Sequence, residues 1–259
     1  MNKILNTVFF GLLATTCIAN PPLCVSVCNG SASTRWDYGD PILPSNEVTV
    51  CLWVRACASN RDIMGNSGGI TNDYGFEVRV NYEDTLSGEF GVTQQAGIAG
   101  DNWSLQSTSI IPSNAYAHCA FTWDGTTNAD AVIVYFDGVQ EATTTATVAA
   151  GPPGTYGLSL CDDQSGSGNF HGYWWDVRAY DRVLSANEIL AIKQTRGKDA
   201  IYEGLVFRPM HTGAQVGQSL DGGTCYDQTR THTTSNISGG AAAPIQCEGG
   251  LGRRYAYSY

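Results

Sequence analysis

The sequence has little charge and very little lysine. Asp, Glu, Lys and Arg make up 15% of its 259 residues, against about 25% in an average soluble protein. Only three lysines are present, and the formal net charge is −10. The sequence shows no basic patch that would neutralise phosphate groups. We therefore do not expect nucleic acid or anionic membrane surfaces as partners.

An apolar stretch near the amino terminus is too short to cross a bilayer. It covers residues 7–19 behind Lys3, whereas a membrane-spanning helix needs about 20 residues. We therefore expect no membrane span. Two interpretations of the stretch stay open: a retained arm, which we favour because the sequence keeps Met1, or a secretory signal that is removed near Ala19.

Motifs of the common hydrolases are also missing. A glycosidase of this size would need two carboxylates held together, for instance in a Glu-x-Asp-x-x-Glu strand, and the sequence contains no such string. A phosphate-binding loop is absent as well. His118 and His171 fall in predicted strands, where we expect hydrogen-bonded structural histidines. We predict that the protein is not an enzyme.

The nine cysteines do not define a metal site or a set of disulfides. Cys24-x3-Cys28 lacks a second pair at zinc-finger spacing. The odd number leaves at least one cysteine unpaired, and no pairing can be deduced from the sequence. Cys119 lies in an apolar run, so we expect a buried thiol there.

Alternating apolar residues predict a protein built mainly of β-strands. In residues 48–54, valines and a leucine alternate with Thr49, Cys51 and Trp53, between segments rich in turn-forming residues. Asp137-Gly138 predicts a tight hairpin because both residues tolerate positive φ. Further strands are expected at residues 76–80, 88–92, 117–123, 131–136, 139–145, 156–161 and 170–180. The pattern predicts an all-β, antiparallel two-sheet jelly-roll sandwich.

One short helix and a carboxyl-terminal extension complete the expected organisation. Ser185 and Glu188 have the spacing of a capping box, and Gly197 can end the helix. Beyond it, residues 204–210 form one more predicted strand. We divide the chain into an apolar segment at residues 1–22, a jelly roll at 23–197 and an extension at 198–259. One strand cannot form its own core, so the extension is expected to dock on the sandwich or on a neighbouring molecule.

Two stretches carry a resemblance to a known family. The first runs through residues 118–125 and the hairpin at 132–138, and the second covers residues 170–189. They contain His-x-Ala, Tyr-x-Asp-Gly, Phe-x-Gly, Arg-x-Tyr and Leu-Ser-x-x-Glu-Ile patterns in this order. The chain resembles the laminin G-like, concanavalin A-like jelly rolls over roughly residues 23–195, which implies the fold more than a function. Strict alternation in the last strand puts Arg178 and Tyr180 on one face and Tyr173 and Trp175 on the other.

The resemblance also raises the question of calcium. Members of the family sometimes hold this ion through loop carboxylates, and Asp162 and Asp163 are the candidates here, with Asp62. One carboxylate pair does not supply the six to eight oxygens that calcium takes. We therefore expect no cofactor, with calcium kept as the alternative.

Aromatic residues are the candidates for binding sugars, because the apolar face of a sugar ring packs on an exposed aromatic ring. We select Trp174, Trp175 and Trp103 as ligand-binding residues. Three further residues are considered with them, although aromatic residues at strand spacing often belong to a core: Trp36, Tyr74 and Tyr116.

Two functional hypotheses remain. The first is a non-enzymatic structural or decoration protein at the surface of a bacteriophage virion, with some capacity to bind glycans. It is expected to form homo-oligomers and to contact coat protein or its own copies. The charge-poor composition, the missing catalytic motifs and the single strand of the extension favour it, and sandwiches resembling this one occur in phage virions. The alternative is a secreted or cell-surface carbohydrate-binding, lectin-like module, which the Asn-x-Ser triplets at Asn29, Asn102 and Asn236 would suit.

Overall fold

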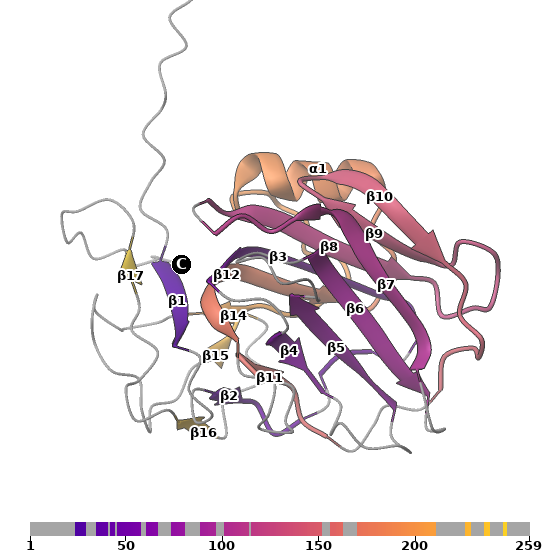
Figure 1. Ribbon diagram of the computed structural model, residues 1–259, viewed down its shortest axis with the longest axis horizontal. Helices are drawn as coiled ribbons and strands as arrows, with labels where there is room; N and C mark the ends of the chain where they lie inside the picture. Colours follow the sequence, from indigo (N-terminus) through magenta and orange to yellow (C-terminus); the bar gives the residue numbers. More distant parts are fainter. Residues whose placement is uncertain are drawn as a thin grey trace, which may run out of the picture.

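In the part of the chain that the structure describes, two large antiparallel sheets pack together, accompanied by a two-stranded sheet and one helix (Figure 1). The structure is a computed structural model. It describes residues 24–29, 35–40, 42–44, 46–57, 61–66, 74–80, 89–96, 101–113, 115–151, 156–162, 170–210, 226–228, 236–238 and 246–247. The predicted amino-terminal segment at residues 1–22 lies outside this part of the chain.

The first sheet has eight strands, in the order β10-β9-β8-β3-β12-β1-β17, with β13 also paired to β12. Its strands are β1 (Cys24–Asn29), β3 (Val48–Ala56), β8 (Ala117–Trp123), β9 (Val132–Phe136), β10 (Val139–Thr144), β12 (His171–Tyr180), β13 (Leu205–Phe207) and β17 (Gln246–Cys247).

The second sheet has seven strands, in the order β16-β2-β11-β4-β5-β6-β7. They are β2 (Arg35–Asp37), β4 (Arg61–Gly65), β5 (Tyr74–Val80), β6 (Glu89–Ala96), β7 (Asp101–Ile110), β11 (Ser159–Leu160) and β16 (Asn236–Ser238), and a separate pair joins β14 (Pro209–Met210) to β15 (Tyr226–Asp227). The two large sheets confirm the predicted jelly-roll sandwich.

The core lies between the sheets and is built from every second residue of the long strands. Val50 and Leu52 of β3 point into it from the first sheet, and Phe76 and Val78 of β5 meet them from the second. Burying each such side chain contributes about 1.5–3 kcal/mol. The residues between them, at the alternate positions, form the outer faces of the two sheets.

The hairpin and the helix form as the sequence predicts. Asp137 and Gly138, between β9 and β10, have φ angles of 50° and 81°. Helix α1 (Ala186–Thr195) begins after Ser185, whose side chain accepts a hydrogen bond from the Glu188 backbone while the Glu188 carboxylate reaches back. It ends at Arg196 in the left-handed conformation. The capping box is therefore confirmed.

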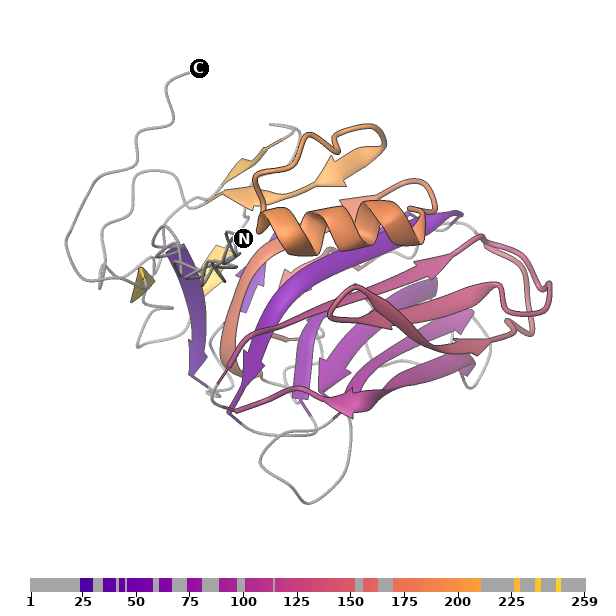
Figure 2. The ribbon, with the colours of Figure 1, turned by 90° about the horizontal axis from the view of Figure 1, so that it is seen from above.

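Helix α1 covers one part of the outer face of the eight-stranded sheet (Figure 2). Ile189 and Ile192 of the helix pack with Cys51 of β3, Ala120 of β8 and Tyr180 of β12. The rest of this outer face lies beyond the end of the helix, and the candidate site lies there.

The described part of the extension adds short strands to both sheets. β13 pairs with β12, β17 pairs with β1, and β16 pairs with β2. Phe207 of β13 is fully buried in the core, edge-on to the ring of Tyr38 at 4.9 Å. The extension therefore contacts the sandwich of its own chain. Its described residues contribute several short strands, whereas the sequence predicted one.

Candidate functional site

Four aromatic side chains form a cluster on the outer face of the eight-stranded sheet. Trp53 comes from β3, Tyr173 and Trp175 from β12, and Tyr116 from the residue before β8. We call these four residues the aromatic cluster. Trp53 and Trp175 are opposite each other in the β3–β12 pair, and their rings stack with centroids 4.8 Å apart. Both tryptophans are buried, whereas Tyr116 and Tyr173 are partly exposed, so the tyrosines form the accessible part.

A β-bulge in β12 determines which residues share this face. Trp175 is opposite Trp53, but Arg178 is opposite Cys51, so three steps on β12 match two on β3. The extra residue is Asp176, which has a φ of 48°. The prediction that Trp175 and Arg178 point to opposite faces was wrong, because the bulge interrupts the strict alternation on which it depended.

Arg55 lies between the two tyrosines of the cluster. Its guanidinium carbon is 3.9 Å from the ring centroid of Tyr173 and 5.4 Å from that of Tyr116. A second arginine, Arg196 at the end of α1, has its guanidinium carbon 5.7 Å from the ring centroid of Trp53. Arginine stacks on aromatic rings through a cation–π interaction, so two positive charges accompany the cluster.

His118 of β8 lies beside the tryptophan stack. It is opposite Trp53, and the two ring centroids are 5.4 Å apart. The imidazole is fully buried, and within the described part of the chain neither of its nitrogens has a hydrogen-bond partner. Burial lowers the pKa of His118 to about 4. The histidine is therefore structural in its position, but it lacks the side-chain hydrogen bonds that we expected.

Charged residues fill the neighbouring part of the same face, under α1. Arg178 is fully buried and forms hydrogen bonds with Asp176 and Asp199. Arg208, from the extension, also contacts Asp176. These carboxylates thus already have arginine partners, and this group forms one border of the aromatic cluster.

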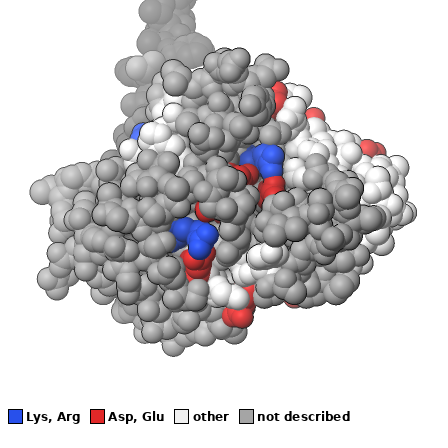
Figure 3. All heavy atoms as spheres, turned by 60° about the horizontal axis from the view of Figure 1, so that its bottom comes forward, with Lys and Arg blue, Asp and Glu red and all other residues white. Residues whose placement is uncertain are grey.

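The outer face of the seven-stranded sheet carries paired charges. Arg79 of β5 contacts Glu77 and Asp62, and Arg35 of β2 contacts Asp37. Figure 3, which brings the lower side of Figure 1 forward, shows basic and acidic atoms against each other in two places on the described surface. Arg35 and Arg79 are therefore neutralised within the protein.

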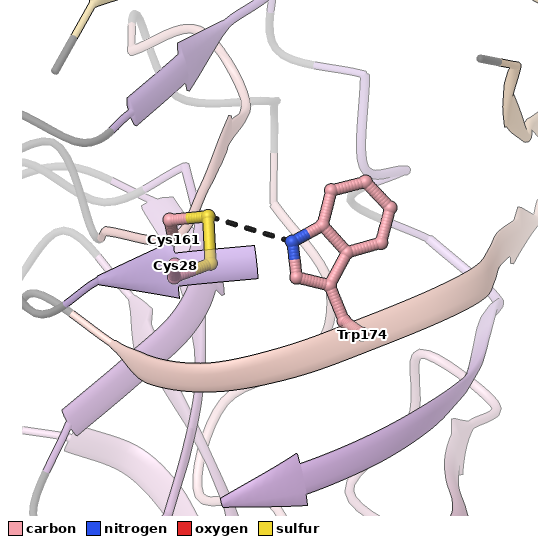
Figure 4. The surroundings of a disulfide bond; sticks show 3 residues. All are labelled: Cys28, Cys161 and Trp174. Carbon is pink, nitrogen blue, oxygen red and sulfur yellow. Dashed lines mark hydrogen bonds between the residues drawn. A yellow bond between two sulfur atoms is a disulfide. The ribbon is translucent and has the colours of Figure 1, made fainter. Parts of the chain in front are cut away.

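Trp103 and Trp174 lie in the core. Trp103 is 4% exposed and packs on Phe76 and Phe121. Trp174 is 1% exposed, and its indole N–H donates to Sγ of Cys161 at 3.4 Å (Figure 4). In these positions the two rings face other core residues rather than a ligand at the surface.

Of the other aromatic candidates, Trp36 is fully buried and lies edge-on to Trp174. The side chain of Tyr74 lies outside the described part. Trp175 and Tyr116 are the two candidates from the sequence that the structure brings together in the cluster.

A disulfide that the sequence did not reveal joins the two sheets beside Trp174. It links Cys28 of β1 to Cys161, which follows β11. Cys51, Cys57 and Cys119 are free thiols, and Cys119 is buried in the core as expected.

The residues considered for calcium do not form a cluster of metal ligands in the described part of the chain. Asp162 is buried, and its carboxylate lies 3.8 Å from the guanidinium of Arg35. Asp163 is outside the described residues. Among the residues that are described, no group of three or more His, Cys, Asp or Glu side chains is placed to hold a metal ion.

Trp53, Arg55 and Tyr173 are the site residues that sequence reasoning missed. A signal was present in residues 48–56, where the tryptophan and the arginine stand at the positions that alternate with the core valines and leucine. A large aromatic residue at a position expected to face away from the core indicates an outer-face contact. The cross-strand partners could not be inferred without the pairing register.

The profile of the family described as the Concanavalin A-like lectin/glucanases superfamily matches residues 29–190. No curated protein sequence matches the chain. In the part of the chain that is described, none of the helices has both the length and the apolar character needed to cross a membrane.

Solved structures with this fold include proteins with carbohydrate ligands. One is a Bacteroides ovatus protein whose carbohydrate-binding role is itself a proposal, at 18% identity and a TM-score of 0.56. The match covers 82% of this chain but only 58% of that one. Domain 4 of the extracellular arabinanase AbnA from Geobacillus stearothermophilus, solved with arabinotriose, matches at 18% identity and a TM-score of 0.50, over 66% of this chain and 76% of that one.

A third structure is the CBM40 of the Ruminococcus gnavus IT-sialidase bound to α2,3 sialyllactose. It matches at 12% identity and a TM-score of 0.50, over 65% of this chain and 96% of that one. At such identities, the three structures show that the fold is shared.

Proposed function

Because this chain belongs to the concanavalin A-like lectin/glucanase superfamily, we propose that it is a non-catalytic carbohydrate-binding module that works outside the cell. Two structures of the same fold were solved with an oligosaccharide. The disulfide between Cys28 and Cys161 is consistent with an oxidising, extracellular location.

The aromatic cluster is the observation that carries the proposal. Sugar rings have an apolar C–H face that packs on aromatic rings and hydroxyl groups that form hydrogen bonds. Tyr116 and Tyr173 offer such rings on the outer face of the sheet. Both pack against the buried Trp53–Trp175 stack, which holds them in place. A site on paired strands keeps its geometry better than a site on loops.

A binding role also agrees with the placement of the acidic residues. Glycosidases use two carboxylates that are free to donate a proton or attack a sugar. On the outer face of the seven-stranded sheet, Glu77, Asp62 and Asp37 instead form ion pairs with arginines. The absence of catalysis can be tested by measuring the release of reducing ends from the polysaccharide that binds best. Measurable hydrolysis would contradict a non-catalytic role.

Glycan-array binding of the whole chain tests the proposal directly. Tyr173→Ala and Tyr116→Ala should each lower the affinity for the bound glycan about tenfold or more, because each removes a ring that the sugar contacts. Tyr202→Ala is the matched control, since Tyr202 is 49% exposed and lies outside the cluster. Absence of any glycan signal, or equal loss in all three variants, would refute the role of the cluster.

The virion role, the coat-protein partner and the homo-oligomer stay predictions. None of the three structures named above is a virion protein, and they favour the alternative hypothesis of a secreted or cell-surface module. The molecules that accompany the chain in its native preparation separate the two hypotheses. Co-purification with a phage particle would favour the virion role over the secreted module.

A further inference from the structure

The described arginine side chains fall into two groups. Five form ion pairs with Asp or Glu: Arg35, Arg79, Arg178, Arg182 and Arg208. The other two, Arg55 and Arg196, have no carboxylate partner among the described residues. Both lie over rings of the aromatic cluster. In a chain with a net charge of −10, this is the place where described guanidinium groups are not neutralised by the protein.

The position of Arg55 is determined by its neighbours. It is opposite Tyr173 in the β3–β12 pair, and the guanidinium lies 3.9 Å from the centroid of that ring. Its Nε atom is buried and has no hydrogen-bond partner within the described residues, although the residue as a whole is partly exposed. Stacking therefore fixes the plane of the guanidinium, while its Nε–H has no acceptor among the described residues.

Arg196 places a second positive charge beside the tryptophan stack. Arg196 is exposed and is the residue at which α1 ends, in the left-handed conformation. Its guanidinium lies 5.7 Å from the ring of Trp53. Trp53 and Arg55 are two residues apart on β3, so their Cα atoms are about 7 Å apart. The two arginines thus lie over different rings of the same cluster, Arg55 over Tyr173 and Arg196 over Trp53.

Acidic side chains that would compete for these arginines are engaged elsewhere. Asp176 and Asp199 are the nearby carboxylates under α1, and both form hydrogen bonds with Arg178. The planar guanidinium of arginine binds carboxylate and sulfate groups through two parallel hydrogen bonds. An anionic group on the ligand would supply the acceptors that the protein does not.

We propose that the aromatic cluster, with Arg55 and Arg196, selects acidic glycans, whose sugars carry carboxylate or sulfate groups. The proposal rests on the proposed carbohydrate-binding function and adds the chemical class of the ligand. The sugar ring packs on Tyr116 and Tyr173, and its anionic group lies against the guanidinium of Arg55. Arg196 contributes at the adjacent sugar or through the longer-range attraction of its charge.

A glycan array of matched pairs tests this inference. Each uronate is paired with its neutral hexose and each sulfated glycan with its unsulfated form, so the two sources of charge are separated. We expect the acidic member of the best pair to bind at least tenfold more tightly, and this preference should fall as salt rises from 0.05 to 0.5 M. Equal or tighter binding of the neutral member would overturn the inference and leave the proposed function intact. Absence of binding to every glycan would overturn both.

Variants then assign the effect to the two arginines. Arg55→Gln should lower the affinity for the acidic glycan about tenfold more than the affinity for its neutral partner, because only the acidic glycan loses the contact with the guanidinium charge. Arg55→Lys should restore only part of the loss, because lysine keeps the charge but not the planar fork. Arg182→Gln, at an ion-paired arginine outside the cluster, is the control.

Arg196→Gln provides an independent test if the Arg55 variants unfold, because Arg196 is exposed at the end of α1. We expect the loss of affinity for the acidic glycan to exceed the loss for its neutral partner by threefold or more. An equal loss for acidic and neutral glycans in the folded Arg55 and Arg196 variants would contradict the inference.

Discussion

Arg178 and Asp199 form a two-point ion pair beneath helix α1. Nη1 and Nη2 of Arg178 donate to Oδ1 and Oδ2 of Asp199 at 2.7 and 2.8 Å. Burial by itself would raise the pKa of Asp199, but the hydrogen bonds and the charge of Arg178 outweigh it and lower the pKa to about 2. The pair links β12 to the segment that follows the helix.

The first prediction concerns this pair. Asp199→Ala should lower the free energy of unfolding by about 3 kcal/mol, because removal of one partner leaves Arg178 buried with less compensation. Urea denaturation at pH 7 measures the change. Glu203→Ala, at an exposed carboxylate nearby, should change it by less than about 0.5 kcal/mol. A loss below about 1 kcal/mol for Asp199→Ala would show that the pair does not stabilise the fold as argued.

The second prediction is a loss of stability in acid caused by His118. Desolvation lowers the folded-state pKa of His118 from 6.5 to about 4, while Asp176 and Asp199 act to raise it and Arg178 and Lys193 to lower it. Between these pH values the unfolded chain binds a proton that the folded chain does not. Stability due to His118 is therefore complete above about pH 6.5 and is lost as the pH falls to about 4, by roughly 3 kcal/mol.

Urea denaturation of the wild type and of His118→Phe, at several pH values from 7 to 4, checks this contribution. The variant should lose less stability than the wild type over this range, because it has no imidazole to protonate. Parallel curves for the two proteins would contradict the assignment. The low pH end also titrates carboxylates, so only the difference between the curves is informative.

The third prediction concerns the disulfide between Cys28 and Cys161, which spans 133 residues of sequence. Cross-links over long loops restrict the unfolded chain, and removal of such a bond costs about 2–5 kcal/mol. The double variant Cys28→Ser/Cys161→Ser should therefore melt at a markedly lower temperature. Cys57→Ser, at a free and partly exposed thiol, should melt close to the wild type. Reducing agent should have no further effect on the double variant.

A fourth prediction tests how firmly the extension is attached. Phe207→Ala should cost about 3–5 kcal/mol, because the ring is fully buried in the core next to Tyr38. Deletion of residues 200–259 should destabilise the domain at least as strongly. Tyr202→Ala, at an exposed ring of the same segment, should leave stability nearly unchanged. A melting temperature that does not change in the deletion variant would show that the sandwich folds without this segment.

Our last prediction is that glycan binding does not need calcium. Asp162 is buried beside the guanidinium of Arg35, whose positive charge disfavours a cation there. Addition of a chelator such as EDTA should leave the affinity for the best glycan within twofold. If EDTA lowered the affinity for the glycan and added calcium restored it, Asp162 and Asp163 would again be candidates for a calcium site.

Local sequence signals predicted the fold well because they act over short distances. The alternation in β3, the Asp137-Gly138 hairpin and the Ser185–Glu188 capping box depend on residues within a few positions of one another. β7 was missed, since its residues Asp101–Ile110 are largely polar and do not alternate as a clear apolar strand. The short strands of the extension are stabilised by pairing with distant partners, which a local pattern does not contain.

The candidate site was harder to predict because it depends on register and burial. Trp174 and Trp175 are adjacent in sequence, yet one faces the core and the other the outer face. Trp53 joins Trp175 only because β3 and β12, more than a hundred residues apart, pair in that register. The disulfide between Cys28 and Cys161 is likewise set by the packing of two sheets.

The bulge in β12 has a chemical consequence. The additional residue gives the strand one more outward-directed side chain than regular pairing provides, and that side chain is the carboxylate of Asp176. It contacts both Arg178 and Arg208. A strand shortened by this single residue would pair without interruption, but Arg178 would then keep only Asp199 and Arg208 would lose its carboxylate partner. The irregularity in the backbone is thus the source of charge balance beneath the helix.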